Sequence, residues 1–294
     1  MTQPFVLLTA AKNEARYIGA TIEAVLRQEV RPSLWVIIDD GSSDDTARIV
    51  QEAASRHPFI ELTMRGGTEA RSFGAKDRAI NDAYKRLAAR RFEIVAIQDA
   101  DISPVSVDCY RRMLEAFAAD PRLGIAGGWV HELHRGRWHP RRGNSLESVP
   151  GGLQIFRRTC YDQIGGYAPL HHGGEDWLAQ LDAQIAGWRM LVLADQPIHH
   201  HRATSSADGR WRGLFRLGLM DGSFGSHPAF EVLKCARRVS HKPYLMGALL
   251  RYLGYLWWST AKGGPVIGAA RVSYLRRQQA ARAALWLKTV RSRP

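Results

Sequence analysis

The sequence of 294 residues has few cysteines, no long hydrophobic run at its start and few acidic residues near its end. Cys109, Cys160 and Cys235 are an odd number without metal-type spacing, so a disulfide scaffold is not expected. The first apolar run, Phe5 to Leu8, is too short for a signal peptide, so we expect the reducing cytoplasm as the compartment. A content of 45% hydrophobic and 23% charged residues excludes wholesale disorder.

Acidic residues are scarce only in the last third of the chain. Residues 1–200 contain 24 Lys and Arg against 25 Asp and Glu, whereas residues 201–294 contain 17 against 3. This local excess of positive charge predicts a polyanionic partner, either nucleic acid or an anionic membrane surface. Because no nucleic-acid recognition motif accompanies the basic residues, we expect a membrane surface and no nucleic acid.

Short apolar runs alternate with helical patterns over the first two hundred residues. Apolar or alternating runs predict strands at residues 5–8, 35–38, 60–64, 94–97, 153–156 and 190–193. The apolar spacing of residues 18–26 predicts an amphipathic helix, and residues 42–45 predict a capping box for a second helix. Residues 131–150 lack periodicity, which predicts a long mobile loop. This order of elements predicts an α/β fold with a mostly parallel sheet.

Polar segments directly follow three of the predicted strands, at residues 9–14, 39–43 and 98–101. The carboxyl ends of parallel strands lie along one edge of an open sheet, where ligands bind. Asp99 and Asp101 alternate on an extended segment and therefore point the same way, and two unpaired carboxylates repel unless a cation lies between them. The sequence thus predicts a ligand site with a cation at this edge.

Four motifs in this order resemble those of the GT-A glycosyltransferases of family 2. They are Thr-Ala-Ala-Lys-Asn-Glu at 9–14, Asp-Asp-Gly-Ser at 39–42, Asp-Ala-Asp at 99–101 and Gly-Glu-Asp-Trp at 174–177. The third is similar to the family's DxD motif and the fourth to its ED motif. The resemblance covers residues 5–201, and it implies a GT-A domain for nucleotide-sugar binding and catalysis at 1–205, followed by a basic helical extension at 206–294.

The resemblance implies a divalent metal ion, Mn or Mg, and a catalytic base. Asp101, with Asp99 close by, would hold the ion that neutralises a diphosphate leaving group. His201, with His199 as second choice, would complete the metal shell and favour Mn, although a run of histidines is also typical of a polar strand end. Asp176 would take the proton of the acceptor hydroxyl, with Glu175 beside it to bind the acceptor or orient the loop. A single displacement then predicts inversion at the anomeric carbon.

The resemblance also assigns residues to the donor and the acceptor. Nucleotide contacts are expected from Thr9, Ala10, Ala11, Asn13, Glu14, Asp39, Asp40, Lys76, Arg78, Asp99 and Ala100. A carboxylate at Asp39 or Asp40 can accept the imide N–H of a pyrimidine, which favours a UDP-sugar. Lys76 and Arg78 would lie near the diphosphate, with a solvated helix face as the alternative. Close to the sugars we expect Gly151, Gly152 and Trp177, the last with a core position as its alternative.

Residues 243–261 form a nineteen-residue stretch with one formal charge, Arg251, long enough to span a bilayer. At 100° per residue, Tyr244, Arg251, Tyr255 and Lys262 share one sector, while Leu245, Leu249, Tyr252 and Leu256 form an apolar stripe. This pattern indicates a helix in the membrane interface, with helices packed on the catalytic domain as the alternative. We expect a peripheral, monotopic enzyme on the cytoplasmic face of the cytoplasmic membrane.

Such a location favours a polyprenyl-diphosphate-linked saccharide as the acceptor, in polysaccharide biosynthesis. A nucleotidyltransferase on a similar fold is an alternative, disfavoured because residues 9–13 lack the glycine of a phosphate-binding loop. A non-catalytic membrane-bound scaffold is another, and it has no need of Asp101, Asp176 and His201 together.

Overall fold

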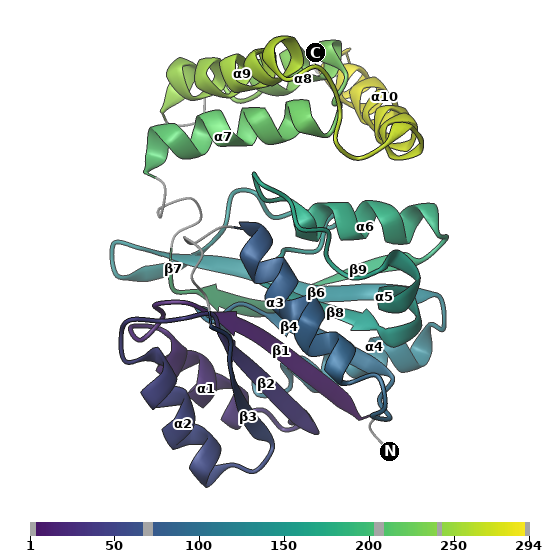
Figure 1. The fold of residues 1–294 in the computed structure, drawn as a ribbon. Coiled ribbons are helices and arrows are strands. Elements are labelled where there is room, and N and C mark those ends of the chain that lie inside the picture. Colours follow the sequence, from purple (N-terminus) through teal and green to yellow (C-terminus); the bar gives the residue numbers. More distant parts are fainter. Residues whose placement is uncertain (1–3, 67–72, 203–208, 240–242, 292–294) are drawn as a thin grey trace. The chain divides into compact units, whose positions relative to one another are not determined.

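A computed structural model describes residues 4–66, 73–202, 209–239 and 243–291. The chain divides into two compact units, Met1–Ala203 and Thr204–Pro294, each of which is described by itself (Figure 1). The change from one unit to the next falls within residues 203–208, outside the described residues.

The first unit is built on one mixed sheet. Its strands are β1 (Phe5–Ala11), β2 (Leu34–Asp39), β3 (Ile60–Met64), β4 (Ile94–Gln98), β5 (Ile102–Pro104), β6 (Leu123–His134), β7 (Arg137–Pro140), β8 (Leu153–Arg157) and β9 (Arg189–His200). The strand order is β3-β2-β1-β4-β8-β6-β9-β5, with β7 paired to β6. Strands β1 to β4 are parallel to one another, and β6 is parallel to β9. The prediction of an α/β fold with a mostly parallel sheet is confirmed.

Helices cover both faces of this sheet. They are α1 (Ile18–Leu26), α2 (Thr46–Arg56), α3 (Phe73–Arg86), α4 (Cys109–Ala119), α5 (Arg158–Ile164) and α6 (Glu175–Ile185). Phe5 and Leu7 of β1 pack with α1, α2 and α4, whereas Val6 and Leu8 pack with α3, α5 and α6. Alternate residues of β1 are therefore buried on opposite faces, as the unbroken apolar run predicts.

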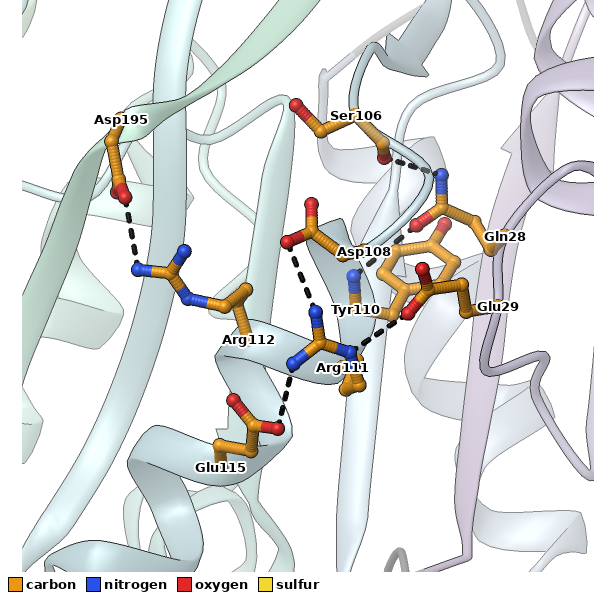
Figure 2. Close-up of polar contacts among 9 residues, drawn as sticks. All are labelled: Gln28, Glu29, Ser106, Asp108, Tyr110, Arg111, Arg112, Glu115 and Asp195. Atoms are coloured by element: carbon orange, nitrogen blue, oxygen red, sulfur yellow. Dashed lines mark hydrogen bonds and ion pairs between the residues drawn. The ribbon is translucent and has the colours of Figure 1, made fainter.

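A polar network fastens the start of α4 to the end of α1 (Figure 2). The Gln28 side chain donates to the Ser106 carbonyl and accepts from the Tyr110 backbone N–H. Arg111 pairs with three carboxylates, those of Glu29, Asp108 and Glu115. Each residue drawn in Figure 2 has at least one polar partner within the fold, so we assign this network to structure rather than to ligand binding.

Two local predictions are wrong. Part of the expected mobile loop, residues 131–140, belongs to the β6–β7 hairpin, because Arg135 and Gly136 both adopt positive φ angles (50° and 77°) and close a two-residue turn. The capping box at residues 42–45 does not form, and α2 begins without a side-chain cap. Instead, the Ser42 hydroxyl accepts from the Asn13 backbone N–H, so the loop after β1 uses the group that the cap needs.

The second unit is helical, with α7 (Arg210–Ser223), α8 (Pro228–Ala236), α9 (Tyr244–Ala261) and α10 (Ala269–Arg291). Helices α7 and α9 approach closely because glycine lies at their contact. A Cβ on Gly218 would overlap the Arg251 carbonyl oxygen, and one on Gly254 would overlap the Phe215 carbonyl oxygen. Among the described residues, no helix has the length and apolar character needed to cross a membrane.

Candidate functional site

The polar segments after β1, β2 and β4 lie at one edge of the sheet. The parallel register pairs Ala11 of β1 with Asp39 of β2, and Leu8 of β1 with Ile97 of β4. The three segments that were predicted to form a site therefore come from three neighbouring strands.

Asp39 and Asp40 have different environments. One oxygen of Asp39 accepts the backbone N–H groups of Gly41 and Ser42, at 2.9 and 2.8 Å, whereas its Oδ2 is buried without a hydrogen-bond partner among the described residues. Asp40 instead pairs with Arg65, at 3.2 Å. An unpaired buried carboxylate oxygen is costly unless a ligand donates to it, so Asp39 is the better placed of the two to accept a hydrogen bond from a ligand.

The other residues predicted at the end of β1 have partners within the fold. The Thr9 hydroxyl is buried and accepts from the Trp35 indole N–H, at 3.0 Å. Asn13 has a left-handed backbone (φ 56°), and its side chain accepts the Ser43 backbone N–H. Glu14 is buried and forms an ion pair with Arg202. Ala10 and Ala11 contribute backbone on the same strand.

Lys76 connects the two acidic motifs. Its Nζ lies 2.5 Å from Asp99 Oδ1 and 3.7 Å from Glu175 Oε1. Burial opposes the charged form of Lys76, but Asp99 and Glu175 raise its pKa above the ordinary value, so the ammonium stays protonated. Burial raises the pKa of Asp99, and Lys76 acts against that shift. Arg78 lies two residues further along α3.

Asp101 lies among the basic side chains at the end of β9. Its Oδ2 is 3.5 Å from His200 Nε2 and 3.5 Å from Arg202 Nε. Burial works against ionisation, but the hydrogen bond and charge of His200 together with Arg202 lower the pKa of Asp101. Asp101 is therefore ionised and able to act as a metal ligand.

The two histidines predicted as metal ligands have other contacts. The His201 ring nitrogen bonds the Ser103 hydroxyl at 2.8 Å, and its backbone N–H donates to the Asp101 carbonyl. His199 stacks on Trp138 of the hairpin, with ring centroids 3.7 Å apart, and burial lowers its pKa to about 4. His200, which the sequence did not single out, is the histidine whose ring nitrogen lies closest to the Asp101 carboxylate in these contacts.

The donor set around Asp101 suits a divalent cation, because carboxylate and imidazole together are good ligands for Mn²⁺. Among the described residues, no group of three or more metal-ligating side chains is already assembled. An ion held by Asp101 therefore needs further ligands, which phosphate oxygens can supply.

Glu175 and Asp176 begin α6 directly after Gly173 and Gly174, whose positive φ angles (77° and 95°) turn the chain into the helix. Burial, followed by the charge of Glu175, raises the pKa of Asp176 to about 6. Such a pKa suits a general base near neutral pH. The side-chain amide of Gln180 donates to the Asp176 carbonyl, at 3.0 Å, and holds the first turn of the helix in place.

Because Gly151 and Gly152 have no side chain, their backbone lies close to the Asp176 carboxylate and to β5, respectively. A Cβ on Gly151 would lie 2.7 Å from the carboxyl carbon of Asp176, and one on Gly152 would lie 2.6 Å from Ile102 Cδ1. The Gly152 carbonyl also accepts the Asp99 backbone N–H at 2.9 Å. The glycines therefore bring the backbone against both acidic motifs. Trp177 follows Asp176 in α6 and is partly buried.

Asp77 was missed by the sequence analysis. It is fully buried on α3, and neither of its carboxylate oxygens has a hydrogen-bond partner among the described residues. Burial and the charge of Glu175 raise the pKa of Asp77 to about 8. The spacing of the sequence indicates that Asp77 is buried, because it lies three residues before Ile80, on the side of α3 that packs on the sheet.

The chain is similar in sequence to known glycosyltransferases. Residues 3–217 match the model of the family described as Glycosyltransferase like family 2. The chain is 26% identical over 220 residues to a β-monoglucosyldiacylglycerol synthase of Synechocystis sp., covering 68% of this chain and 44% of the relative. It is 32% identical over 123 residues to a poly-β-1,6-N-acetyl-D-glucosamine synthase of Staphylococcus epidermidis, covering 41% of this chain and 27% of the relative. The chain thus spans less than half the length of these curated relatives.

Solved structures share the fold at low sequence identity. One is a mannosyltransferase of Pyrobaculum calidifontis in complex with GDP-Man and Mn²⁺, with a TM-score of 0.59 and 20% identity, covering 97% of this chain and 76% of the other. Another is TarS of S. aureus in complex with UDP-GlcNAc, with a TM-score of 0.57 and 17% identity, covering 74% of this chain and 65% of the other.

Proposed function

Because the chain belongs to Glycosyltransferase like family 2 and has the GT-A fold, we propose that it transfers a sugar from a nucleotide-sugar donor to a saccharide acceptor, with inversion. One observation carries this proposal: Lys76 lies within 2.5 Å of Asp99 and 3.7 Å of Glu175. A single ammonium group thereby joins the acidic pair after β4 to the carboxylates that begin α6. Groups for a diphosphate and a base for a hydroxyl are close together, as glycosyl transfer requires.

In the proposed reaction, Asp176 is the base. The acceptor oxygen forms a bond to the anomeric carbon while the bond from that carbon to the diphosphate breaks, and Asp176 takes the hydroxyl proton. The electron pair of the broken bond leaves with the diphosphate. One displacement by one base inverts the configuration. Lys76 offsets the repulsion between Glu175 and Asp99 and supplies positive charge beside the departing group.

We propose Asp101 as the principal metal ligand, with Asp99 and the histidines of the β9 end as further candidates. His200 joins His201 and His199 in this set because its ring faces Asp101. When bound, the ion supplies positive charge to the diphosphate oxygens. The likeness of the fold to the mannosyltransferase structure solved with Mn²⁺ supports this choice of metal.

The proposed donor is a UDP-sugar, supported by the unpaired Oδ2 of Asp39 and by a structural neighbour bound to UDP-GlcNAc. The proposed acceptor is lipid-linked, with a polyprenyl-diphosphate saccharide as the specific candidate. Relatives named for synthesis of a glycolipid and of a polysaccharide support this class. The basic second unit supports a location at the cytoplasmic face of the cytoplasmic membrane.

The proposal is tested by screening nucleotide sugars for stabilisation of the protein with and without Mn²⁺. A bound donor raises the melting temperature by mass action, and we expect the largest rise for a UDP-sugar with metal present. The best donor is then offered with lipid-linked saccharides, and the anomeric configuration of the product is determined by NMR. Absence of stabilisation by every donor, or retention at the anomeric carbon, contradicts the proposal.

A further inference from the structure

Helix α9 exposes its most apolar side. Leu245, Met246, Leu249, Leu253, Leu256 and Trp257, here called the α9 stripe, are between 37% and 61% exposed. At 100° per residue they lie within about one third of the helix circumference. A helix packed in a water-soluble protein ordinarily turns such a stripe towards the core.

The opposite side of α9 is buried and contains charge. Arg251 is only 7% exposed, and its guanidinium pairs with Asp221 of α7 at 2.7 Å. Asp221 also pairs with Lys234 of α8, at 2.7 Å. The sequence grouped Arg251 and Tyr255 with Lys262 in one sector of an interfacial helix, but both side chains are buried within the unit. Their burial is what turns the leucines outward.

The rotation of α9 is strongly constrained. Turning the stripe inward would expose the buried ion pair and would bring larger side chains to the places where Gly254 and Gly218 allow close contact with α7. Breaking a buried ion pair leaves an uncompensated charge, which is among the costliest changes in a protein interior. The exposed stripe is therefore a property of the packed unit.

The second unit carries a large excess of positive charge. Residues 204–294 contain 16 Lys and Arg against 3 Asp and Glu, and all three acidic residues lie before α9. Lys262 directly follows α9, and Arg276 and Arg277 are exposed on α10. A unit that combines an exposed apolar stripe with excess positive charge complements an anionic phospholipid surface, which offers phosphate groups above an apolar layer.

We propose that the α9 stripe inserts into the interface of a bilayer containing anionic phospholipid, while the basic residues that follow α9 contact the phosphate groups. This inference deepens the membrane location proposed above and rests on it. It names the residues of the inserted face, which extends the predicted leucine stripe to Met246, Leu253 and Trp257 and leaves Arg251 and Tyr255 buried in the unit. The binding has a salt-sensitive part from the basic residues and a salt-resistant part from the stripe.

The test is co-sedimentation of the full chain with vesicles of phosphatidylglycerol and phosphatidylcholine, at low and high salt. For Leu249→Glu combined with Leu253→Glu, we expect the vesicle partition coefficient at high salt to fall at least tenfold. The matched control is Val232→Glu on α8, which is 53% exposed and lies off the stripe, and should bind as the wild type does. Arg276→Glu with Arg277→Glu should weaken binding at low salt only.

Circular dichroism and donor binding verify that each variant is folded, and Leu249→Ala with Leu253→Ala provides a milder change that should lower binding in the same direction. Unchanged vesicle binding by both stripe variants overturns the inference. The inference is also overturned if the stripe only holds two copies of the chain together. In that case the stripe variants change from dimer to monomer but still bind vesicles. A variant that no longer binds vesicles should still transfer sugar to a water-soluble acceptor, because the proposed chemistry does not depend on the stripe. Failure of the membrane inference can therefore be distinguished from failure of the proposed glycosyl transfer.

Discussion

Replacing Asp77 with asparagine should stabilise the protein increasingly as the pH rises. Asp77 is fully buried, both of its oxygens lack hydrogen-bond partners among the described residues, and its pKa is raised to about 8 by burial and by Glu175. In the unfolded chain the carboxyl returns to an ordinary value near 3.8. Between these two values the folded protein keeps a proton that the unfolded chain releases.

The sign follows from proton linkage. Stability falls with rising pH wherever the folded state binds more protons, by about 1.36 kcal/mol per pH unit for one group. From pH 5 to pH 7, Asp77 alone should therefore lower the free energy of unfolding by about 2.7 kcal/mol. Asparagine has nearly the same shape and does not titrate, so the advantage of Asp77→Asn should grow by that amount across this window.

The assay is urea unfolding at pH 5, 6 and 7, in which the difference between the two proteins cancels the titrating groups that do not interact with Asp77. Asp82→Asn on the same helix serves as the control, because the Asp82 side chain is half exposed and its loss should change stability little. Parallel pH dependence of wild type and Asp77→Asn would refute the assignment of a buried, protonated carboxyl at this position.

The remaining predictions concern the reaction. Asp176→Asn should lower kcat by on the order of 10² or more with donor binding retained, and wild-type turnover should fall as the pH drops through about 6, where the base becomes protonated. A variant with normal turnover would remove Asp176 from the role of base. Gly151→Ala should lower kcat by about 10- to 100-fold because its Cβ would displace that carboxylate, whereas Gly19→Ala, with open space around the added Cβ, should be neutral. Asp101→Ala should abolish transfer and the Mn²⁺-dependent part of donor affinity measured by calorimetry, and persistence of that part would exclude Asp101 as the metal ligand.

The local pattern of apolar and polar residues was sufficient to predict the order of strands and helices and the positions of the acidic motifs. The apolar runs at β1, β2 and β4 predicted buried parallel strands, and parallel strands bring their polar ends to one edge whatever the details of packing. The positions of Asp99 and Asp101 after β4, and of Glu175 and Asp176 after a glycine pair, were therefore visible in the sequence. So was the division of charge between the two parts of the chain.

The tertiary structure decided what depends on contacts between distant residues. Which histidine faces Asp101 is set by the pairing of β5 with β9, which no single-strand pattern contains. Lys76 could be placed between two acidic motifs only once α3 and α6 were packed on the same face of the sheet. A helix pattern gives the spacing of α9 but not its rotation, and the ion pair between Arg251 and Asp221, thirty residues apart, settled that rotation. Periodicity is a local property, whereas burial and charge pairing are set by the neighbours that folding supplies.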